Sequence, residues 1–132
     1  MTSSAKKKTK PNPFLWVVEP LMEEPSYLAK PMFGCLAIYL HGRLMLVLCS
    51  GEEPWNGVLL PTERQYHDDI RQEFMEAIQH PVLKKWLYLP EALDDFETTV
   101  MEIVEAVRGG DQRFGVEPKV RAQKSKGKKP MP

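Results

Sequence analysis

The chain has 132 residues, 42% of them apolar, which is enough to bury one hydrophobic core and predicts a single domain. It has no apolar run of about 18 residues and no signal-peptide core before Phe14, so we expect a cytoplasmic protein that does not enter a membrane. The net charge of zero hides a separation, because all 18 acidic residues but only eight basic ones lie between positions 11 and 118, which gives a body near −10 between two basic ends.

Both ends of the chain are poor in apolar residues. Residues 1–13 are predicted to be a disordered basic head, residues 14–110 the folded domain, and residues 111–132 an extended or disordered basic tail. The ends could be solvated segments, which we favour, or could contact nucleic acid, or could fold back on the acidic body. The candidate nucleic-acid contacts are Lys6, Lys7, Lys8, Lys10, Lys124, Lys126, Lys128 and Lys129, among which no aromatic residue stands to stack on a base.

The first elements of the domain are expected to be a short helix and a hairpin. Two prolines break residues 14–30, so a short helix is predicted near residues 20–29. Residues 32–40 and 44–50 are predicted strands joined at His41–Arg43, and a third strand follows over residues 58–61. Apolar residues occupy both faces of these strands, as in the centre of a sheet.

The second half predicts a helix, a strand and a final helix. The first helix is expected over residues 62–80, with Thr62 and Gln65 as a capping box. A strand is expected over residues 82–90 and a helix over residues 94–109, for which Asp94 is the expected N-cap, with the apolar stripe Phe96, Val100, Ile103, Val104 and Val107.

This element order predicts an α+β fold. We expect a two-layer sandwich, with an antiparallel sheet of four or five strands and helices packed mainly on one face, in the order α-β-β-β-α-β(-β)-α.

The two cysteines flank the hairpin, and its register decides how they lie. A two-residue loop of His41 and Gly42 places Cys35 opposite Leu48, whereas a three-residue loop makes Cys35 and Cys49 direct neighbours. We favour the second register because it aligns apolar residues on one face. Without a C-x-x-C motif or a nearby cation, the cysteines are expected to be small buried hydrophobes, and no cofactor or metal is predicted.

No known catalytic motif stands out in the sequence. The three histidines lack helical metal spacing, and the paired acidic residues stand on predicted loops or at helix starts. We therefore predict no catalytic residue and favour a non-enzymatic role. An enzyme or small-molecule site assembled from distant residues stays an open alternative.

Three aromatic residues are candidates for partner binding. Trp55 follows a proline in a polar loop, where it could anchor a partner or, as we favour, cover the end of the core. Trp86 and Tyr88 share one face of a predicted strand and could form an exposed aromatic patch.

The segment "KPMFGCLAIYLHGRLMLVL" (30–48) resembles the opening of the TfoX N-terminal domain family, with Met32, Phe33 and Gly34 followed by Ile38, Tyr39, Gly42 and Arg43. Residues 86–107 are similar to the closing strand and helix of that family. The resemblance implies an α+β fold, and because no second helical domain is expected after residue 110, we expect a short stand-alone bacterial protein that differs from the two-domain members of that family. It implies no catalytic residue, because the shared motif contains none.

From these observations we expect a regulatory or interaction module that binds another protein, with a homodimer as a further possibility. Nucleic-acid binding through the lysine-rich ends is the first alternative, and an enzyme or small-molecule binder is the second.

Overall fold

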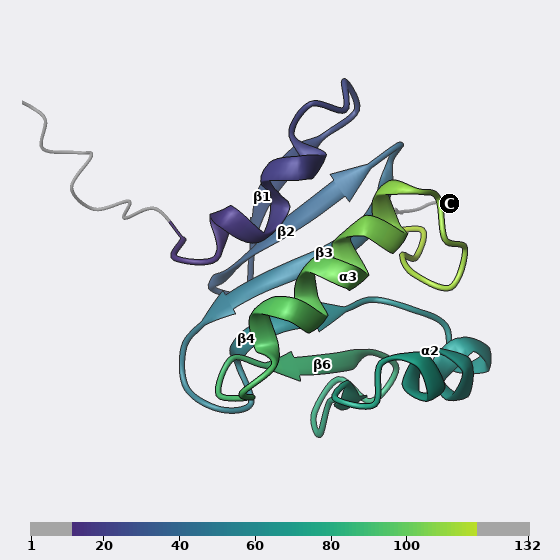
Figure 1. The fold of residues 1–132 in the computed structure, drawn as a ribbon. Helices are drawn as coiled ribbons and strands as arrows, with labels where there is room; N and C mark the ends of the chain where they lie inside the picture. The colour runs from purple at the N-terminus through teal and green to yellow at the C-terminus, as the bar shows by residue number, and fades with distance from the viewer. Residues whose placement is uncertain (1–11, 119–132) are drawn as a thin grey trace, which may run out of the picture.

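A computed structural model describes residues 12–118, which form one open antiparallel sheet with helices packed over one face (Figure 1). The α+β fold predicted from the sequence is confirmed. The strands are β1 (Leu28–Met32), β2 (Cys35–Leu40), β3 (Arg43–Ser50), β4 (Asn56–Leu60), β5 (Ile78–Gln79) and β6 (Leu87–Pro90), in the spatial order β1-β2-β3-β4-β6-β5. The helical segments are η1 (Leu15–Leu21), η2 (Arg64–Tyr66), α2 (His67–Glu73) and α3 (Phe96–Arg108).

The final helix forms as its apolar spacing predicts. All five residues of the predicted apolar stripe are buried, and α3 packs with η1 against the sheet (Figure 1). The N-cap is Asp95 instead of the expected Asp94, and its side chain makes no capping hydrogen bond. Burial of the apolar stripe, more than capping, therefore holds this helix in place.

The sheet has six strands, whereas the sequence predicted four or five, because β1 and β5 include residues that the sequence predicted as helical. The helix predicted near residues 20–29 is wrong: η1 ends at Leu21, and β1 begins at Leu28, which pairs with Tyr39. Pro25 separates the two elements, and the pairing to β2 satisfies a backbone that an isolated short helix could not stabilise.

The predicted helix over residues 62–80 is too long. Only α2 is α-helical, because the backbone leaves the helix at Phe74 and residues 78–79 pair with β6 as β5. The capping box is also wrong, since the Thr62 hydroxyl donates to the carbonyl of Arg113 at 2.6 Å. The strand predicted over residues 82–90 is limited to its last four residues.

The hairpin contains both of the registers that the sequence left open. Next to the turn, Leu40 pairs with Arg43 around a two-residue loop, whereas farther out Leu36 pairs with Leu48. A bulge between Ile38 and Tyr39 converts one register into the other. The outer register makes Cys35 and Cys49 neighbours, as we favoured, while the inner one pairs Tyr39 with Leu44.

The packed unit extends beyond residue 110. Phe114 is buried in the main core, and Val116 exchanges two backbone hydrogen bonds with Leu44 of β3, at 2.9 and 3.0 Å. Residues 111–118 therefore belong to the folded domain. The rest of the predicted tail lies outside the described residues, as does most of the predicted head.

Candidate interaction surface on the open face of the sheet

The sheet buries apolar side chains on both faces, but helices cover only one of them. Paired residues of neighbouring strands point to the same face. One such row crosses all six strands on the face opposite α3 and consists of Lys30, Ala37, Val47, Leu59, Tyr88 and Ile78. The cluster around this row contains no helical residue, and its cover comes from side chains such as Trp55, Leu83 and Val116. We call this side the open face.

An apolar groove of about 1260 Å³ lies on the open face. Its floor includes Tyr39 and Leu44, and the segment 82–86 and the C-terminal residues 116–118 line its sides. Two large apolar side chains on its margin are well exposed, Phe33 at 55% and Val82 at 61%. An exposed apolar surface around a hollow is typical of a binding site.

His80 holds one wall of the groove in position. The backbone N–H groups of Val82 and Leu83 donate to its Nδ1 at 3.0 and 2.9 Å, and its Nε2 lies 2.9 Å from the carbonyl of Pro54. Because Nδ1 accepts, Nε2 must carry the proton and donate it to that carbonyl. Burial lowers the pKa of His80, which agrees with a neutral ring.

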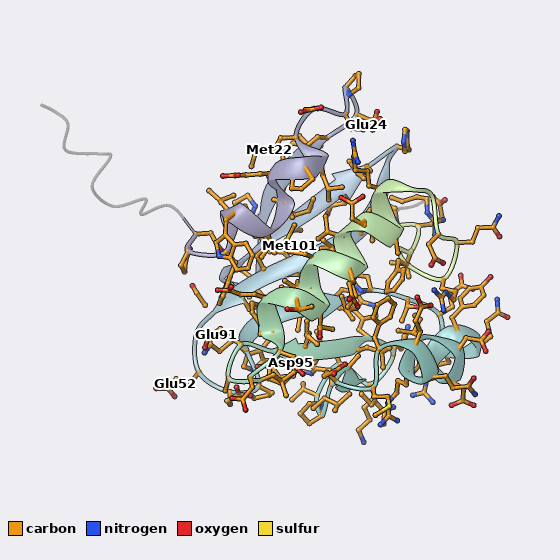
Figure 2. The ribbon with its side chains drawn as sticks, viewed as in Figure 1. Met22, Glu24, Glu52, Glu91, Asp95 and Met101 are labelled. Atoms are coloured by element: carbon orange, nitrogen blue, oxygen red, sulfur yellow. The ribbon has the colours of Figure 1, made fainter. Side chains whose placement is uncertain are left out.

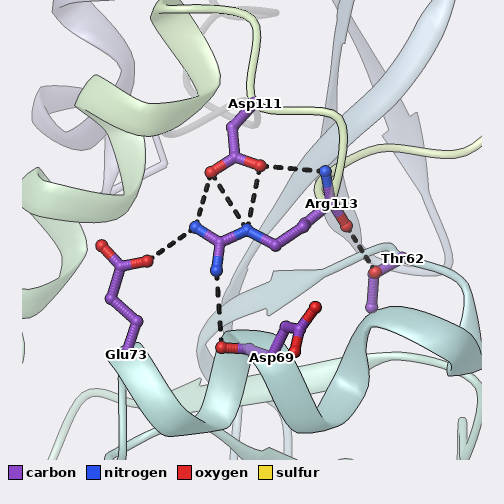
Figure 3. Close-up of polar contacts among 5 residues, drawn as sticks. All are labelled: Thr62, Asp69, Glu73, Asp111 and Arg113. Carbon is purple, nitrogen blue, oxygen red and sulfur yellow. Dashed lines mark hydrogen bonds and ion pairs between the residues drawn. The ribbon is translucent and has the colours of Figure 1, made fainter.

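Arg113 anchors the chain segment that leads to the other wall, and Figure 3 shows its polar contacts. Its Nε donates to both carboxylate oxygens of Asp111, and its Nη2 donates to Asp111 and, at 2.7 Å, to Glu73 of α2. The Thr62 hydroxyl donates to its carbonyl, and Phe114 beside it is buried. This network fixes the segment that continues into residues 116–118 of the groove.

The turn between β1 and β2 presents Phe33 in a costly backbone conformation. Both Phe33 (φ +32°) and Gly34 (φ +81°) have positive φ, which is uncommon for a bulky residue and costs on the order of 1 kcal/mol. The ring packs edge-on against Trp55, with centroids 5.7 Å apart, yet stays half exposed. The turn thus holds a large aromatic ring in water at the end of the groove.

The structure separates the three predicted partner-binding aromatics. The prediction that Tyr88 belongs to an exposed aromatic patch is wrong. The side chain is 1% exposed, and its hydroxyl donates toward Glu53 and the carbonyl of Asn56. Loops cover this face of β6, which the strand alternation could not reveal. Trp86 is half-buried and lines the groove, and Trp55 is half-buried over the ring of His80, with centroids 4.5 Å apart.

Both cysteines lie on the open face. Cys49 is buried and Cys35 is half-buried, and both are unbridged. Burial raises the pKa of the Cys49 thiol, and a hydrogen bond with Cys35 raises it further. The surroundings keep Cys49 a protonated, apolar side chain.

Charge divides the two sides of the sheet. The segments 14–27 and 91–108, which include η1 and α3, hold nine acidic residues and one basic residue, Arg108. Figure 2 shows Glu24, Glu91 and Asp95 on this helical side. The groove, in contrast, is lined by Arg64, Lys84 and Lys85 together with Glu63 and Glu117.

All three histidines contact neighbouring groups, and Nδ1 of His41 lies 3.4 Å from the Ser26 hydroxyl. Both nitrogens of His80 are engaged, and Nε2 of His67 contacts the carbonyl of Lys85 at 2.8 Å. Among residues 12–118, no three His, Cys, Asp or Glu side chains are placed to hold a metal ion. A hollow of about 660 Å³ beside the end of α3 has its arginines Arg43 and Arg108 in ion pairs with Glu117 and Glu105.

No helix within the described range is long and apolar enough to cross a membrane. The eight lysines predicted as nucleic-acid contacts lie outside residues 12–118. No family model, curated protein or solved structure matches the chain.

Proposed function

We propose that this chain is a non-catalytic interaction module, cytoplasmic and bacterial like the TfoX N-terminal domains it resembles, that binds a segment of a partner protein in the open-face groove. The observation that carries the proposal is an apolar groove of about 1260 Å³ on the sheet face that η1 and α3 do not cover.

The composition of the groove supports a polypeptide ligand. Tyr39 and Trp86 give it broad amphipathic surfaces, and Phe33 and Val82 are exposed at its margin. Aromatic residues around a hollow are the usual anchors of protein interfaces. A segment with apolar side chains would remove this surface from water, which is the main driving force for such binding.

Catalysis has less support. A general base needs a nitrogen or oxygen free to take a proton, and His80 has both ring nitrogens in hydrogen bonds with the backbone. At the smaller hollow the Ser26 hydroxyl lies 3.4 Å from Nδ1 of His41, but it donates to Glu24 and accepts from the backbone N–H of His41, which is the contact pattern of a structural turn. Nucleic-acid binding through the lysine-rich ends stays a prediction from composition.

Selection from a random peptide library against the full chain tests the proposal. Peptides that bind the wild type should lose affinity for Val82→Asp, because a carboxylate placed in the groove needs water that a bound apolar side chain displaces. The matched control is Met75→Asp, which alters another exposed apolar residue, 74% exposed, outside the groove. Circular dichroism checks that both variants fold.

Peptides that bind both variants as well as the wild type would refute the groove as the site. Sedimentation at rising protein concentration addresses a homodimer. If the wild type dimerises and Val82→Asp does not, the partner segment belongs to a second copy of this chain.

A further inference from the structure

The groove has a cationic wall whose charged side chains form no ion pair within the described chain. Arg64, Lys84 and Lys85 line it together, and within residues 12–118 none of them forms an ion pair. A hydrogen bond between the ring of His67 and the carbonyl of Lys85 joins the two segments that carry these cations. Three of the eight basic residues between positions 11 and 118 thus face one hollow.

This wall stands out because the rest of the body is acidic. Of the two carboxylates in the groove, Glu117 pairs with Arg43 at 3.2 Å, whereas Glu63 accepts only from the neutral side chain of Gln65 and keeps its charge, so the groove lining holds three unpaired cations against one unpaired carboxylate. The acidic helical side lies across the sheet, a separation of roughly 10 Å or more between packed layers. At physiological salt its field is largely screened over that distance.

We propose that the groove selects an acidic amphipathic segment of a partner protein, whose apolar side chains enter the groove while its carboxylates pair with Arg64, Lys84 and Lys85. This inference rests on the proposed function and adds the charge of the partner to it. The acidic helical side would repel such a segment, so the two sides of the sheet together direct it to the groove.

The segment binds through its side chains and not by adding a strand. The exposed edge of β1 contains Pro31, which lacks the N–H needed for pairing, and β5 at the other edge has only two residues. An anionic lipid could also combine apolar chains with negative charge. The strained, exposed Phe33 and the aromatic lining favour a polypeptide, because aromatic anchors recur at protein interfaces.

The experiment uses three labelled peptides that share leucine and phenylalanine at helical spacing. All remaining positions carry glutamate in the first peptide, glutamine in the second and lysine in the third. Binding to the full chain is followed by fluorescence anisotropy at two salt concentrations. The glutamate peptide should bind roughly tenfold tighter than the glutamine peptide, and this advantage should shrink at high salt. The lysine peptide should bind weakest.

Two charge reversals locate the effect. The double variant Lys84→Glu/Lys85→Glu should weaken the glutamate peptide about tenfold and leave the glutamine peptide nearly unchanged. The control Arg108→Glu reverses a cation on the helical side, whose side chain is 56% exposed, and should change neither peptide.

The outcomes separate this inference from the proposed function. Equal binding of the glutamate and glutamine peptides, lost in both cases with Val82→Asp, would keep the groove as a binding site and overturn its preference for acidic partners. Binding of the glutamate peptide that survives Val82→Asp would place the site elsewhere and overturn the inference. Displacement of the peptide by phosphatidylglycerol vesicles would assign the groove to anionic lipid and overturn both.

Discussion

Replacing His80 by alanine tests whether one buried ring holds a wall of the groove. The ring is fully buried and makes three contacts with backbone groups, two as acceptor and one as donor. It also lies under Trp55 and 5.4 Å from the ring of Tyr88. Alanine removes all of these contacts at once.

The loss can be estimated from these contacts. Two backbone N–H groups and one carbonyl lose their partners, at about 1 kcal/mol each where water can partly replace them. The missing ring adds a cavity beneath Trp55. We therefore expect His80→Ala to lower the free energy of unfolding by about 2–4 kcal/mol.

His80→Asn is the matched control. An asparagine oxygen lies near the position of Nδ1 and can accept from the N–H groups two and three residues ahead, as Asx turns do. It cannot reach the carbonyl of Pro54. His80→Asn should therefore recover about half of the loss, as measured by urea unfolding followed by circular dichroism and tryptophan fluorescence.

The same ring should make stability depend on pH. Because burial lowers the pKa of His80, this histidine binds a proton near pH 6.5 in the unfolded chain and only at lower pH in the folded chain. Stability should therefore fall as pH drops below about 6.5, and His80→Asn should lack this part of the decline. An unfolding free energy of His80→Ala within about 0.5 kcal/mol of the wild type would refute the role of the ring.

Three further predictions concern other parts of the domain. A hydrogen bond from Arg113 lowers the pKa of Asp111, so the ionised carboxylate stabilises the fold above the usual pKa of an aspartate, and this stabilisation is lost as pH falls through the lowered pKa. In Asp111→Asn, the free energy of unfolding should therefore depend less steeply on pH below about pH 4. Gly57 has φ +149°, and a Cβ there would overlap a carbonyl of β6, so Gly57→Ala should cost roughly 2 kcal/mol or more in urea unfolding. A thiol reagent should label Cys35 in the native chain and reach Cys49 only on unfolding; fast labelling of both would contradict the buried position of Cys49.

Elements that depend on local apolar spacing could be predicted from the sequence. The stripe from Phe96 to Val107 forms the buried face of α3, and the runs on either side of His41–Arg43 form the central hairpin. These segments carry their pattern within themselves. Residues 28–32 and 78–79 do not, because they become strands only by pairing with β2 and β6.

Only part of the candidate site could be predicted from the sequence, for the same reason. Trp86 lines the groove as a candidate partner-binding residue should, whereas the burial of Tyr88 depends on cover from His80 and Trp55 that strand alternation does not encode. The sequence places Phe33 in a motif that resembles the TfoX N-terminal domains and does not indicate an exposed anchor. Its Phe-Gly turn with positive φ became evident only in three dimensions.

One signal in the sequence did point to the groove. In β3, six consecutive residues from Leu44 to Cys49 are apolar, and all are buried, so both faces of this strand must be kept from water. The helices η1 and α3 cover one face of the sheet, and the open face has loop side chains as its cover within the described domain. Loops bury less apolar surface than a packed layer of helices, which leaves the groove between them. An amphipathic partner segment lying there would supply what a second helical layer supplies in a sheet covered on both sides, and this is why we place the interaction on that face.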